Sequence, residues 1–450
     1  MNRSRAYKRT DVKRVNLTAL RERTLEFGNA GVTVGLDIGK SEIVACLRWP
    51  HGEFERPWSI RNPDQIPACM DVLQLVKSAG DSLTVGMEST GYGEAIRRGL
   101  TEQGIEVHRV SGKATYDYHE IFDGVPSQHD GKDAAVIAEL TAFGKGRPWP
   151  WQADSELLAL VKHQVFRAEA YRSQQTQWSG RLEGLLARHW PELTNLLKLE
   201  SPTLLRMIEH YRSPARVAAD AEAAQRLAGW GGPKLQESKI RQVIESARLT
   251  QGVPTSDAES LWLGEVACDS LAAYRQIQSA KREISALLAG DPSWSRYTPI
   301  GAGTLGAIWA HAGDPRDYDS GGALLKGLGL NLKERSSGRR QGQLAISKRG
   351  SSEARRWIFF WALRAVQREE VSPWYAEFTQ VGRKASEHGQ QEARRMKGVV
   401  AVMRKLVRGL RCAMIHEEDF DYSKLFADQP VKKKRRRQRR SRHGRSDGLS

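Results

Sequence analysis

The sequence predicts an α/β domain with a mixed sheet, followed by a helical or coiled-coil region and a mostly α-helical C-terminal domain. Between residues 31 and 146, β-rich runs alternate with helical ones, which is typical of a sheet covered by helices. From residue 152 to 290, apolar residues recur every three or four positions, which indicates long packed helices. The Gly/Pro-rich stretch GKGRPWPW at 144–151 separates the two patterns.

The elements of the first domain follow from their residue patterns. Helices are expected at 63–80 and 93–104, because each segment closes on a glycine, a common residue at helix ends. Residues 129–140, HDGKDAAVIAEL, predict a short apolar helix. Runs rich in β-branched and aromatic residues predict strands, at 31–39, 41–49, 54–62, 82–90 and 105–112.

The rest of the chain divides where the composition changes. Residues 157–190 and 270–290 suit two long antiparallel helices, either as a coiled coil or within an ordinary helical bundle. A Gly- and Arg-rich loop is expected at 327–350, and a helix at 353–367. The predicted organisation is an N-terminal basic, helical extension (1–30), the α/β domain (31–146), the helical region (152–290), a C-terminal domain (291–415) and a disordered basic tail (416–450).

Charge points to a polyanionic partner. The chain carries a formal net charge of +17 over 450 residues. The segment Lys432–Arg445 holds ten Lys and Arg residues and no acid, and the remainder of the chain is also basic. Nucleic acid is the simplest partner for such a surface, and a tail that only improves solubility is the alternative.

Several classes of protein are not favoured. No apolar run approaches the roughly 20 residues of a membrane span, and the basic N-terminal segment lacks the apolar stretch of a signal peptide. We therefore expect a soluble cytoplasmic protein. The cysteines are scattered and form no C-x-x-C pair, so neither a disulfide framework nor a zinc site is expected. Any metal should be held by oxygen ligands.

Four carboxylates stand out. Asp37 and Glu88 each end an apolar strand, in VGLDIG and TVGMESTG, although strands disfavour acids. Asp130 and Asp133 lie three apart on one face at the start of a helix. A helix cap (Asp130) and a partner for the helix dipole (Asp133) are the simpler explanations.

If these four acids converge, their repulsion must be offset by a cation. Oxygen ligands suit Mg²⁺ or Mn²⁺. Two such ions would hold a phosphodiester and stabilise its transition state. The sequence therefore makes a metal centre for phosphoryl chemistry one of two explanations for these residues.

The order Asp, Glu, Asp-x-x-Asp resembles the RuvC-like branch of the ribonuclease H fold. In particular it resembles the DEDD transposases of bacterial insertion sequences that carry a catalytic serine, a family that includes the Piv-type invertases. The matching words are VGLDIGK, VGMESTG and D-x-x-D-A-x-x-I-A from Asp130 to Ala138. The resemblance implies that the four acids form a catalytic, metal-binding set. A lysine that is common in the family two residues before Asp130 is Gln128 here.

The C-terminal domain is similar to the same family. It has a glycine-rich turn, then Gly-Leu, a Ser-Gly pair in a basic loop, an I-x-K-x-G word and an Arg-bearing helix. These words are PIGAG (299–303), Gly329-Leu330, Ser337-Gly338, ISKRG (346–350) and Arg355-Arg356. Leu332 replaces the family's proline. The resemblance implies that Ser337 is the nucleophile, with Ser336 as the adjacent competitor.

The residues around Ser337 suit a phosphate, because cations there would bind it and stabilise developing negative charge. A serine hydroxyl needs activation, and residues 327–350 contain no histidine. Taken alone, the loop better fits a phosphate contact in which Ser337 only donates a hydrogen bond, and the family resemblance reverses this preference. The turn before residue 304 also offers backbone amides to a phosphate. The expected nucleic-acid contacts are Arg335, Arg339, Arg340, Lys348, Arg349, Arg355 and Arg356.

The resemblance further implies a composite site in which the serine and the carboxylates close over DNA and a covalent serine–DNA intermediate forms. It implies donor and target DNA, a non-coding bridge RNA that pairs with both, and a dimer or tetramer. Trp149 and Trp151, beside Arg147, either stack on bases or anchor domains. The function expected is a metal-dependent transposase or site-specific recombinase. The alternatives are a RuvC-type endonuclease that cuts branched DNA by water attack and a non-catalytic nucleic-acid scaffold.

Overall fold

The computed structural model describes residues 8–27, 31–80, 82–124, 129–337, 340–380 and 388–427. Within these ranges the side chains of 335–337, 340–343, 380 and 388–394 are not described. The chain forms two compact units, residues 1–153 and 154–450.

The first unit is built on a seven-stranded mixed sheet of order β1-β4-β3-β2-β5-β6-β7. Its centre is a three-stranded antiparallel meander. Beyond the first strand of the meander, the sheet continues with two strands that run parallel to that strand. The meander is β2 (Val32–Ile38), β3 (Glu42–Arg48) and β4 (Trp58–Arg61), and the parallel strands are β5 (Leu83–Met87) and β6 (Glu106–Arg109). Short edge strands, β1 (Thr10–Asp11) and β7 (Arg147–Pro148), complete it. The strands expected from the sequence are confirmed, and β1 and β7 are additions that the sequence analysis does not predict.

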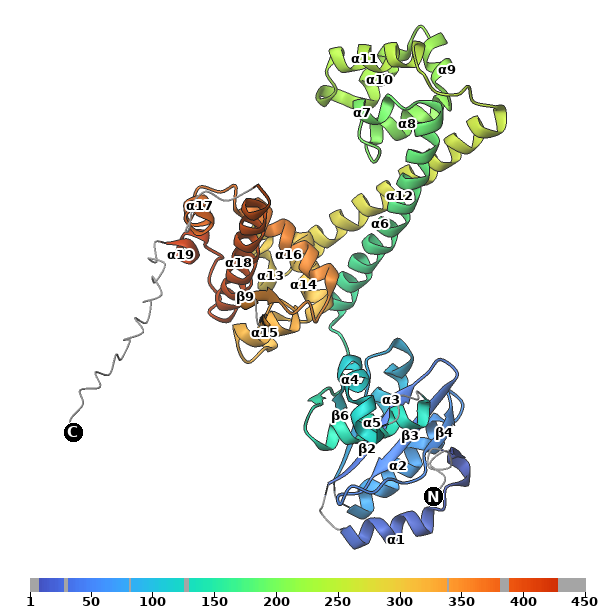
Figure 1. Cartoon of the computed structure of the whole chain (residues 1–450), viewed down its shortest axis with the longest axis vertical. Helices are drawn as coiled ribbons and strands as arrows, with labels where there is room; N and C mark the ends of the chain where they lie inside the picture. Colours follow the sequence, from blue (N-terminus) through green and yellow to red (C-terminus); the bar gives the residue numbers. More distant parts are fainter. Residues whose placement is uncertain are drawn as a thin grey trace, which may run out of the picture. The chain divides into compact units, whose positions relative to one another are not determined.

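Helices cover both faces of this sheet (Figure 1). One face shares a core with three helices, α1 (Leu17–Phe27), α2 (Ile66–Gly80) and α3 (Glu94–Glu102). The other face packs against two helices, α4 (Gly112–Asp123) and α5 (Asp130–Ala142). Strand alternation sorts the side chains, because successive residues point to opposite faces. Val34 and Leu36 therefore enter the first core, whereas the side chain of Thr33 bonds the carbonyl of Ala138 in α5.

Helix α5 lies unusually close to the sheet because two strand residues are glycines. A Cβ atom placed on Gly35 would stand 2.0 Å from the carbonyl oxygen of Ala134. A Cβ atom placed on Gly86 would stand 1.9 Å from Oγ1 of Thr141. A side chain at Gly35 would push the backbone of α5 away, and one at Gly86 would displace the side chain of Thr141, so VGLDIG and VGMESTG allow the strands and α5 to approach closely.

The second unit begins with two long antiparallel helices, α6 (Glu156–His189) and α12 (Asp257–Gly290) (Figure 1). Their direction follows from the ion pairs that join them, Arg188 to Glu259 at 3.2 Å and Arg167 to Glu283 at 3.5 Å. The predicted long helix and its antiparallel mate are therefore confirmed, with α12 starting well before residue 270.

Between these helices the chain forms a separate small core around Trp190, Tyr211 and Leu271. It is made of short helices gathered at one end of the α6–α12 pair (Figure 1). They are α7 (Leu193–Leu196), α8 (Pro202–Tyr211), α9 (Pro214–Ala219), α10 (Ala223–Gly231) and α11 (Glu237–Arg248).

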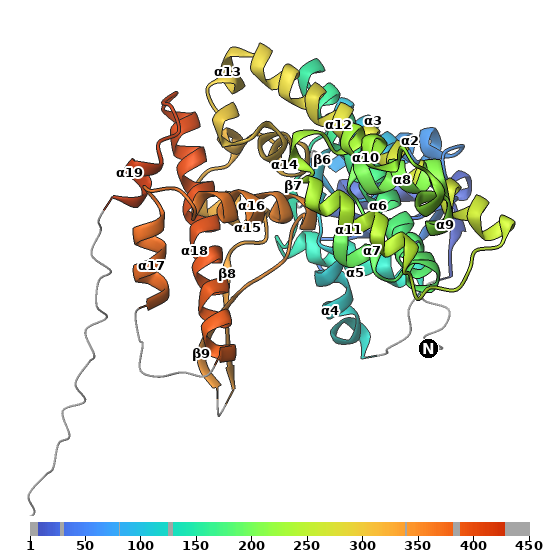
Figure 2. The same cartoon turned by 90° about the horizontal axis from the view of Figure 1, so that it is seen from above.

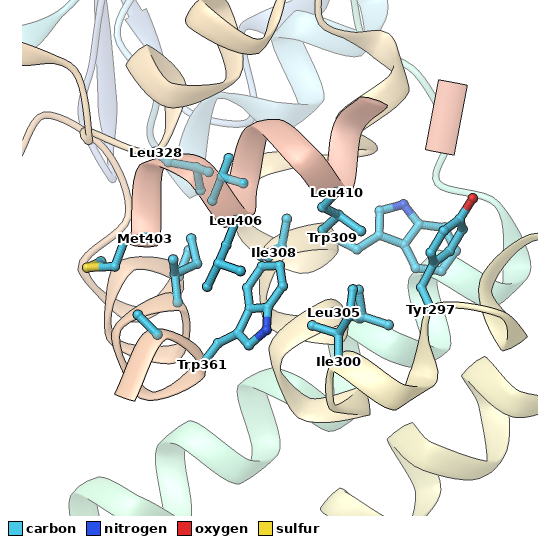
Figure 3. Close-up of a cluster of buried hydrophobic side chains, with 14 of the residues drawn as sticks. Tyr297, Ile300, Leu305, Ile308, Trp309, Leu328, Trp361, Met403, Leu406 and Leu410 are labelled. Atoms are coloured by element: carbon cyan, nitrogen blue, oxygen red, sulfur yellow. The ribbon is translucent and has the colours of Figure 1, made fainter. Parts of the chain in front are cut away.

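The C-terminal part of the second unit packs against the other end of α6 and α12. Its core joins Val165 and Ile284 of these helices to Leu305, Trp309 and Trp361 (Figure 3). The elements are α13 (Pro292–Ser295), α14 (Ala302–Ala312), α15 (Gly321–Gly327), α16 (Ser352–Ala365), α17 (Ser372–Gln380), α18 (His388–Ile415) and α19 (Tyr422–Phe426). In the view from above, α17, α18 and α19 lie on one side of α14 and α16 (Figure 2), and α18 packs against α16. Phe426, within the segment expected to be the tail, is buried in this core.

The loop expected at 327–350 is wrong in part, since it forms a two-stranded antiparallel hairpin. Its strands are β8 (Leu332–Ser337) and β9 (Arg340–Ile346), with Leu332 opposite Ile346. The strands are rich in charged and small residues, which are uncommon in strands, so alternation gave no strand signal. The backbone therefore holds Ser337 at the end of a strand.

No helix among the described residues is both long and apolar enough to cross a membrane.

Candidate metal centre and serine hairpin

Strand alternation directs two of the predicted acids toward α5. Asp37 follows Thr33 and Gly35 in β2 at a spacing of two, and both of these residues contact α5. Glu88 follows Gly86 at the same spacing, one residue beyond β5. Because β2 and β5 are parallel, with Leu36 opposite Met87, the two acids leave the same edge of the sheet.

The first turn of α5 carries the other two acids. His129, and not Asp130, is the N-cap residue, and its side chain accepts a hydrogen bond from the Lys132 amide. The cap explanation for Asp130 is therefore wrong. Asp130 and Asp133 both lie in the first helical turn, where carboxylates also interact favourably with the helix dipole.

Three of the four predicted acids meet in one cluster. Asp37, Asp130 and Asp133 each offer a carboxylate oxygen, and these oxygens lie within 4.8 Å of one another. Burial, and then the charges of neighbouring carboxylates, raise the pKa of Asp37 to about 7. The neighbours are Asp133, Asp130 and Glu88. The surrounding protein therefore does not fully offset the negative charge of the cluster with positive charge.

Glu88 lies close to this cluster but is not one of its three converging oxygens. A Cβ atom on Gly112 would stand 2.8 Å from Oε2 of Glu88, so this carboxylate rests against the first residue of α4. Its charge still contributes to the raised pKa of Asp37. The structure thus brings Asp37, Asp130 and Asp133 together and leaves Glu88 beside them.

Two cationic or polar side chains, neither expected from the sequence, contact the cluster. Nη1 of Arg9 lies 2.9 Å from Oδ2 of Asp130 and 2.7 Å from Oε2 of Glu42. Nε2 of the buried His119 is hydrogen-bonded to Oδ1 of Asp133. No motif marks either residue, because Arg9 comes from the edge-strand segment and His119 from α4, and neither element is predicted.

The cluster fits a divalent cation on chemical grounds. Its donors are carboxylate oxygens, the ligand type that Mg²⁺ and Mn²⁺ prefer. A cation between Asp37, Asp130 and Asp133 would offset the repulsion that raises the pKa of Asp37. The contacts of Arg9 and His119 each use one oxygen of a carboxylate, so every member retains a second oxygen.

The base of the serine hairpin is a close crossing of two chain segments. Gly329 has a φ of +69°, and a Cβ atom there would lie 2.7 Å from the carbonyl oxygen of Arg349. Gly350 has a φ of +143°, and a Cβ atom there would lie 2.2 Å from the carbonyl oxygen of Gly327. Both features demand glycine, which explains why the words Gly-Leu and I-x-K-x-G occur together.

Arg355 holds this crossing in place. Its Nη1 donates to the carbonyl oxygens of Gly350 at 2.7 Å and Leu328 at 3.2 Å. Arg355 therefore has a structural task at the base of the hairpin besides any contact with nucleic acid. Lys348 and Arg349 are exposed on the same crossing, where their charges are accessible to a ligand.

The structure places the backbone of Ser337 at the end of β8, where it pairs with Arg340. Ser336 precedes it in the same strand. The side chains of Arg335, Ser336, Ser337 and Arg340 lie outside the described residues. Gln128, Gly338 and Arg339 also lie outside them.

The Gly301–Gly303 turn serves packing. Gly301 has a φ of +117° and precedes α14. A Cβ atom on Gly303 would lie 3.0 Å from the ring of Trp357, so that ring rests on the glycine. The guanidinium of Arg364 donates to Oγ1 of Thr304 at 3.2 Å. The turn thereby fits α14 against α16.

The two tryptophans near the unit boundary are held by the first unit's own residues. The Trp149 ring lies 4.1 Å from the guanidinium of Arg97, and the Trp151 ring lies 5.3 Å from that of Arg98. The Trp151 amide also donates to Oγ1 of Thr101 at 2.8 Å. These contacts favour anchoring over base stacking.

Two family models match the chain. The DEDD_Tnp_IS110 model, described as Transposase, matches residues 34–191. The model described as Transposase IS116/IS110/IS902 family matches residues 296–380. A comparison with curated proteins gives no match.

The two matches cover the two sets of motifs separately. The first spans all four predicted acids, and the second spans the serine hairpin. A DEDD transposase domain implies a ribonuclease H-like fold, so the expected fold class is confirmed: a mixed sheet with helices, followed by mostly helical structure. The chain therefore carries two transposase domains of the IS110 type, which identify it as a DNA transposase.

Proposed function

We propose that this transposase is a metal-dependent recombinase that cuts and exchanges DNA strands through a covalent bond between Ser337 and DNA. The observation that carries the proposal is the meeting of Asp37, Asp130 and Asp133 within 4.8 Å, beside Glu88. Mg²⁺ or Mn²⁺ held there supplies charge stabilisation for a phosphodiester. We also propose that the chain is related to serine-dependent and Piv-type recombinases, because it carries the motifs of the serine hairpin.

The serine step conserves the number of phosphodiester bonds. The Ser337 oxygen forms a bond to a DNA phosphorus atom, and the bond from phosphorus to the leaving deoxyribose oxygen breaks. The leaving oxygen takes a proton, and the serine proton passes to a base. A hydroxyl of a second DNA strand then attacks the same phosphorus and releases the serine, so no external energy source is needed.

We assign the base to the carboxylate cluster, because residues 327–350 contain no histidine. Carboxylates act as general bases in enzymes, and the cluster gathers three of them beside Glu88. Arg335, Arg339, Arg340, Lys348 and Arg349 would bind the phosphate that the serine attacks.

We further propose that donor and target DNA are selected by a non-coding bridge RNA and that the enzyme acts as a dimer or tetramer. The net charge of +17 supports binding of more than one nucleic acid. Apolar side chains exposed along the long helices support assembly there; they are Leu160, Phe166, Leu261 and Trp262.

A RuvC-type endonuclease is the second candidate. The carboxylate cluster is complete within the first unit, and such a cluster supports hydrolysis of branched DNA by water attack. That enzyme would leave free DNA ends and would not need Ser337. A non-catalytic scaffold, the third candidate, would need neither the serine nor the acids.

One experiment separates the three. Strand exchange and strand cleavage are measured on labelled donor and target DNA, with the RNA that co-purifies with the full chain. The proposal predicts that Ser337→Ala and Asp37→Asn each abolish exchange, while the matched Ser336→Ala retains it. Cleavage that survives Ser337→Ala and fails with Asp37→Asn would establish the nuclease. Activity that withstands both changes would establish a scaffold acting with another enzyme.

A further inference from the structure

A hollow in the second unit lies between α6, α12 and α16. Its volume is about 510 Å³, within the ~300–1,000 Å³ of small-ligand sites. It combines four cations with an apolar wall from α16. The cations are Arg172 of α6, Lys281 of α12, and Arg356 and Arg364 of α16, and the wall is formed by Trp357, Phe360 and Leu363. Of these residues, only Arg356 belongs to the motifs named in the sequence analysis.

The apolar wall is a second face of α16. One face carries Ile358 and Trp361 into the core of the unit (Figure 3). The other carries Trp357, Phe360 and Leu363 toward the hollow, spaced three residues apart. Phe360 remains 45% exposed and Leu363 37% exposed, so this aromatic face is open to a ligand.

The cations that line the hollow have few carboxylates at ion-pair distance. Burial lowers the pKa of both Arg172 and Lys281, and the charge of Arg356 lowers both further, whereas Glu353, Glu169 and Glu200 act in the opposite direction on Arg172. Across the residues that the structure describes, neither side chain has a carboxylate within 4.0 Å. Arg356 pairs with Glu353 at 2.7 Å. Among the described residues, Arg356 is thus the one cation of the four that has a carboxylate within 4.0 Å, which favours an anionic ligand.

Two buried donors add to this. Nε of Arg356 and the indole Nε1 of Trp357 are buried and have no hydrogen-bond acceptor among the described residues. The guanidinium of Arg172 lies 5.3 Å from the Trp357 ring centroid, which holds cation and aromatic group together. An anionic ligand that carries a flat ring would match the cations and the aromatic side chains that line the hollow.

We propose that this hollow binds an unpaired nucleotide of a DNA or RNA strand. Arg172, Lys281 and Arg356 bind its phosphate, and its base stacks on the aromatic face of α16. Paired bases are already stacked within a duplex, so only an unpaired or displaced base can use that face. The inference rests on the proposed function only in that the enzyme handles DNA and RNA strands. It places the contact far along the sequence from the carboxylates.

The test measures binding of the full chain to single-stranded oligonucleotides that carry 2-aminopurine, whose fluorescence is quenched on stacking. Matched DNA and RNA oligonucleotides identify which strand is preferred, and versions with an abasic position remove only the base. The variants are Arg172→Gln, Lys281→Gln and Phe360→Ala. Arg181→Gln is the control, since Arg181 lies on the same helix α6, stacks on Trp178 at 4.6 Å and does not line the hollow.

Each of the three variants is expected to weaken binding about tenfold, the scale of one stacked base or one phosphate contact. Phe360→Ala should abolish the 2-aminopurine quenching and change nothing with the abasic strand. The two charge variants should weaken binding of both strands and reduce its salt dependence. Arg181→Gln should leave the quenching unchanged.

Equal losses in the control and the three variants, or quenching that withstands Phe360→Ala, would overturn the inference. An acidic peptide that binds at the hollow more tightly than either oligonucleotide would also overturn it. The outcome is independent of the catalytic proposal, because Asp37→Asn must bind these strands normally. Loss of strand exchange in Ser337→Ala, with normal quenching in all hollow variants, would retain the proposed function and remove this site.

Discussion

Arg9 and Asp130 form an ion pair, with Nη1 of the arginine 2.9 Å from Oδ2 of the aspartate. A cation bound between Asp37, Asp130 and Asp133 would compete with this guanidinium for the same carboxylate. Arg9 therefore occupies, in part, the electrostatic position of a metal. Its second partner, Glu42 at 2.7 Å, keeps the side chain close to the sheet edge when Asp130 is engaged elsewhere.

Removing this competitor should strengthen metal binding. Arg9→Gln is expected to raise the Mn²⁺ affinity about two- to fivefold, since exposed ion pairs contribute roughly 0.2–1 kcal/mol. Titration calorimetry measures the change, and Arg21→Gln, an exposed arginine on α1, is the control. A weaker affinity in Arg9→Gln would show that the guanidinium supports the metal site instead of competing with it.

Metal binding should depend on pH around neutrality. The pKa of Asp37 is raised to about 7, so below that value a proton must leave before a cation binds. The apparent Mn²⁺ affinity is expected to fall about tenfold for each pH unit below 7 and to level off above it. Titrations at pH 6, 7 and 8 in two buffers of different ionisation enthalpy also count the released proton.

The same measurement on Asp37→Asn provides the control. The variant lacks the titrating carboxylate, so its affinity should be low and free of this pH step. A pH step of equal size in the variant would assign the proton to another group and contradict the role given to Asp37.

Because α5 lies so close to β2, we expect that a side chain at Gly35 destabilises the first unit. Gly35→Ala is expected to lower the free energy of unfolding by about 1–3 kcal/mol, the usual cost of overpacking. The metal affinity should fall as well, because α5 carries Asp130 and Asp133. Denaturant unfolding and calorimetry measure the two effects.

Gly91→Ala is the matched control in the same unit, since a Cβ atom there meets nothing within 4 Å. If Gly35→Ala is as stable as Gly91→Ala and binds metal equally well, Gly35 is not needed for the close approach of α5 to the sheet. Gly86→Ala, which meets Thr141 instead of the helix backbone, should show a smaller effect because a side chain can move aside.

The arginine at the base of the hairpin should control the order of β8 and β9. Arg355→Gln removes donors to Gly350 and Leu328. Faster hydrogen exchange of the hairpin amides is expected, together with slower strand exchange and an unchanged Mn²⁺ affinity. Exchange rates equal to those of the parent chain would assign Arg355 to nucleic-acid binding alone.

The sequence predicted those parts of the molecule whose pattern is local. Runs rich in β-branched and apolar residues identified β2, which carries Asp37, and β5, which Glu88 follows, and helical spacing identified α6. The hairpin around Ser337 was not predicted, because its strands are rich in charged residues and are stabilised by long-range contacts such as that of Arg355. The role of His119 was not predicted for a related reason. Its contact with Asp133 depends on the packing of α4 on α5.

For two features, the explanation that the sequence suggested is replaced by one based on packing in the folded chain. Asp130 is not the cap, because His129 fills that position and frees the aspartate for the cluster. Gly303 supports the ring of Trp357, so the glycine turn shapes the wall of a hollow far along the chain. Such long-range uses of a residue leave no periodic signal in a single sequence.

The central claim is that Ser337 bonds covalently to DNA in a reaction that the carboxylate cluster supports. The most direct measurement denatures the reaction mixture formed with Mn²⁺, digests the bound DNA and protein, and maps the peptide that keeps a nucleotide by mass spectrometry. The account predicts one modified peptide with the nucleotide on Ser337, absent in Asp37→Asn. A nucleotide on Ser336 or on another residue, or cleaved DNA with no modified peptide, would contradict it.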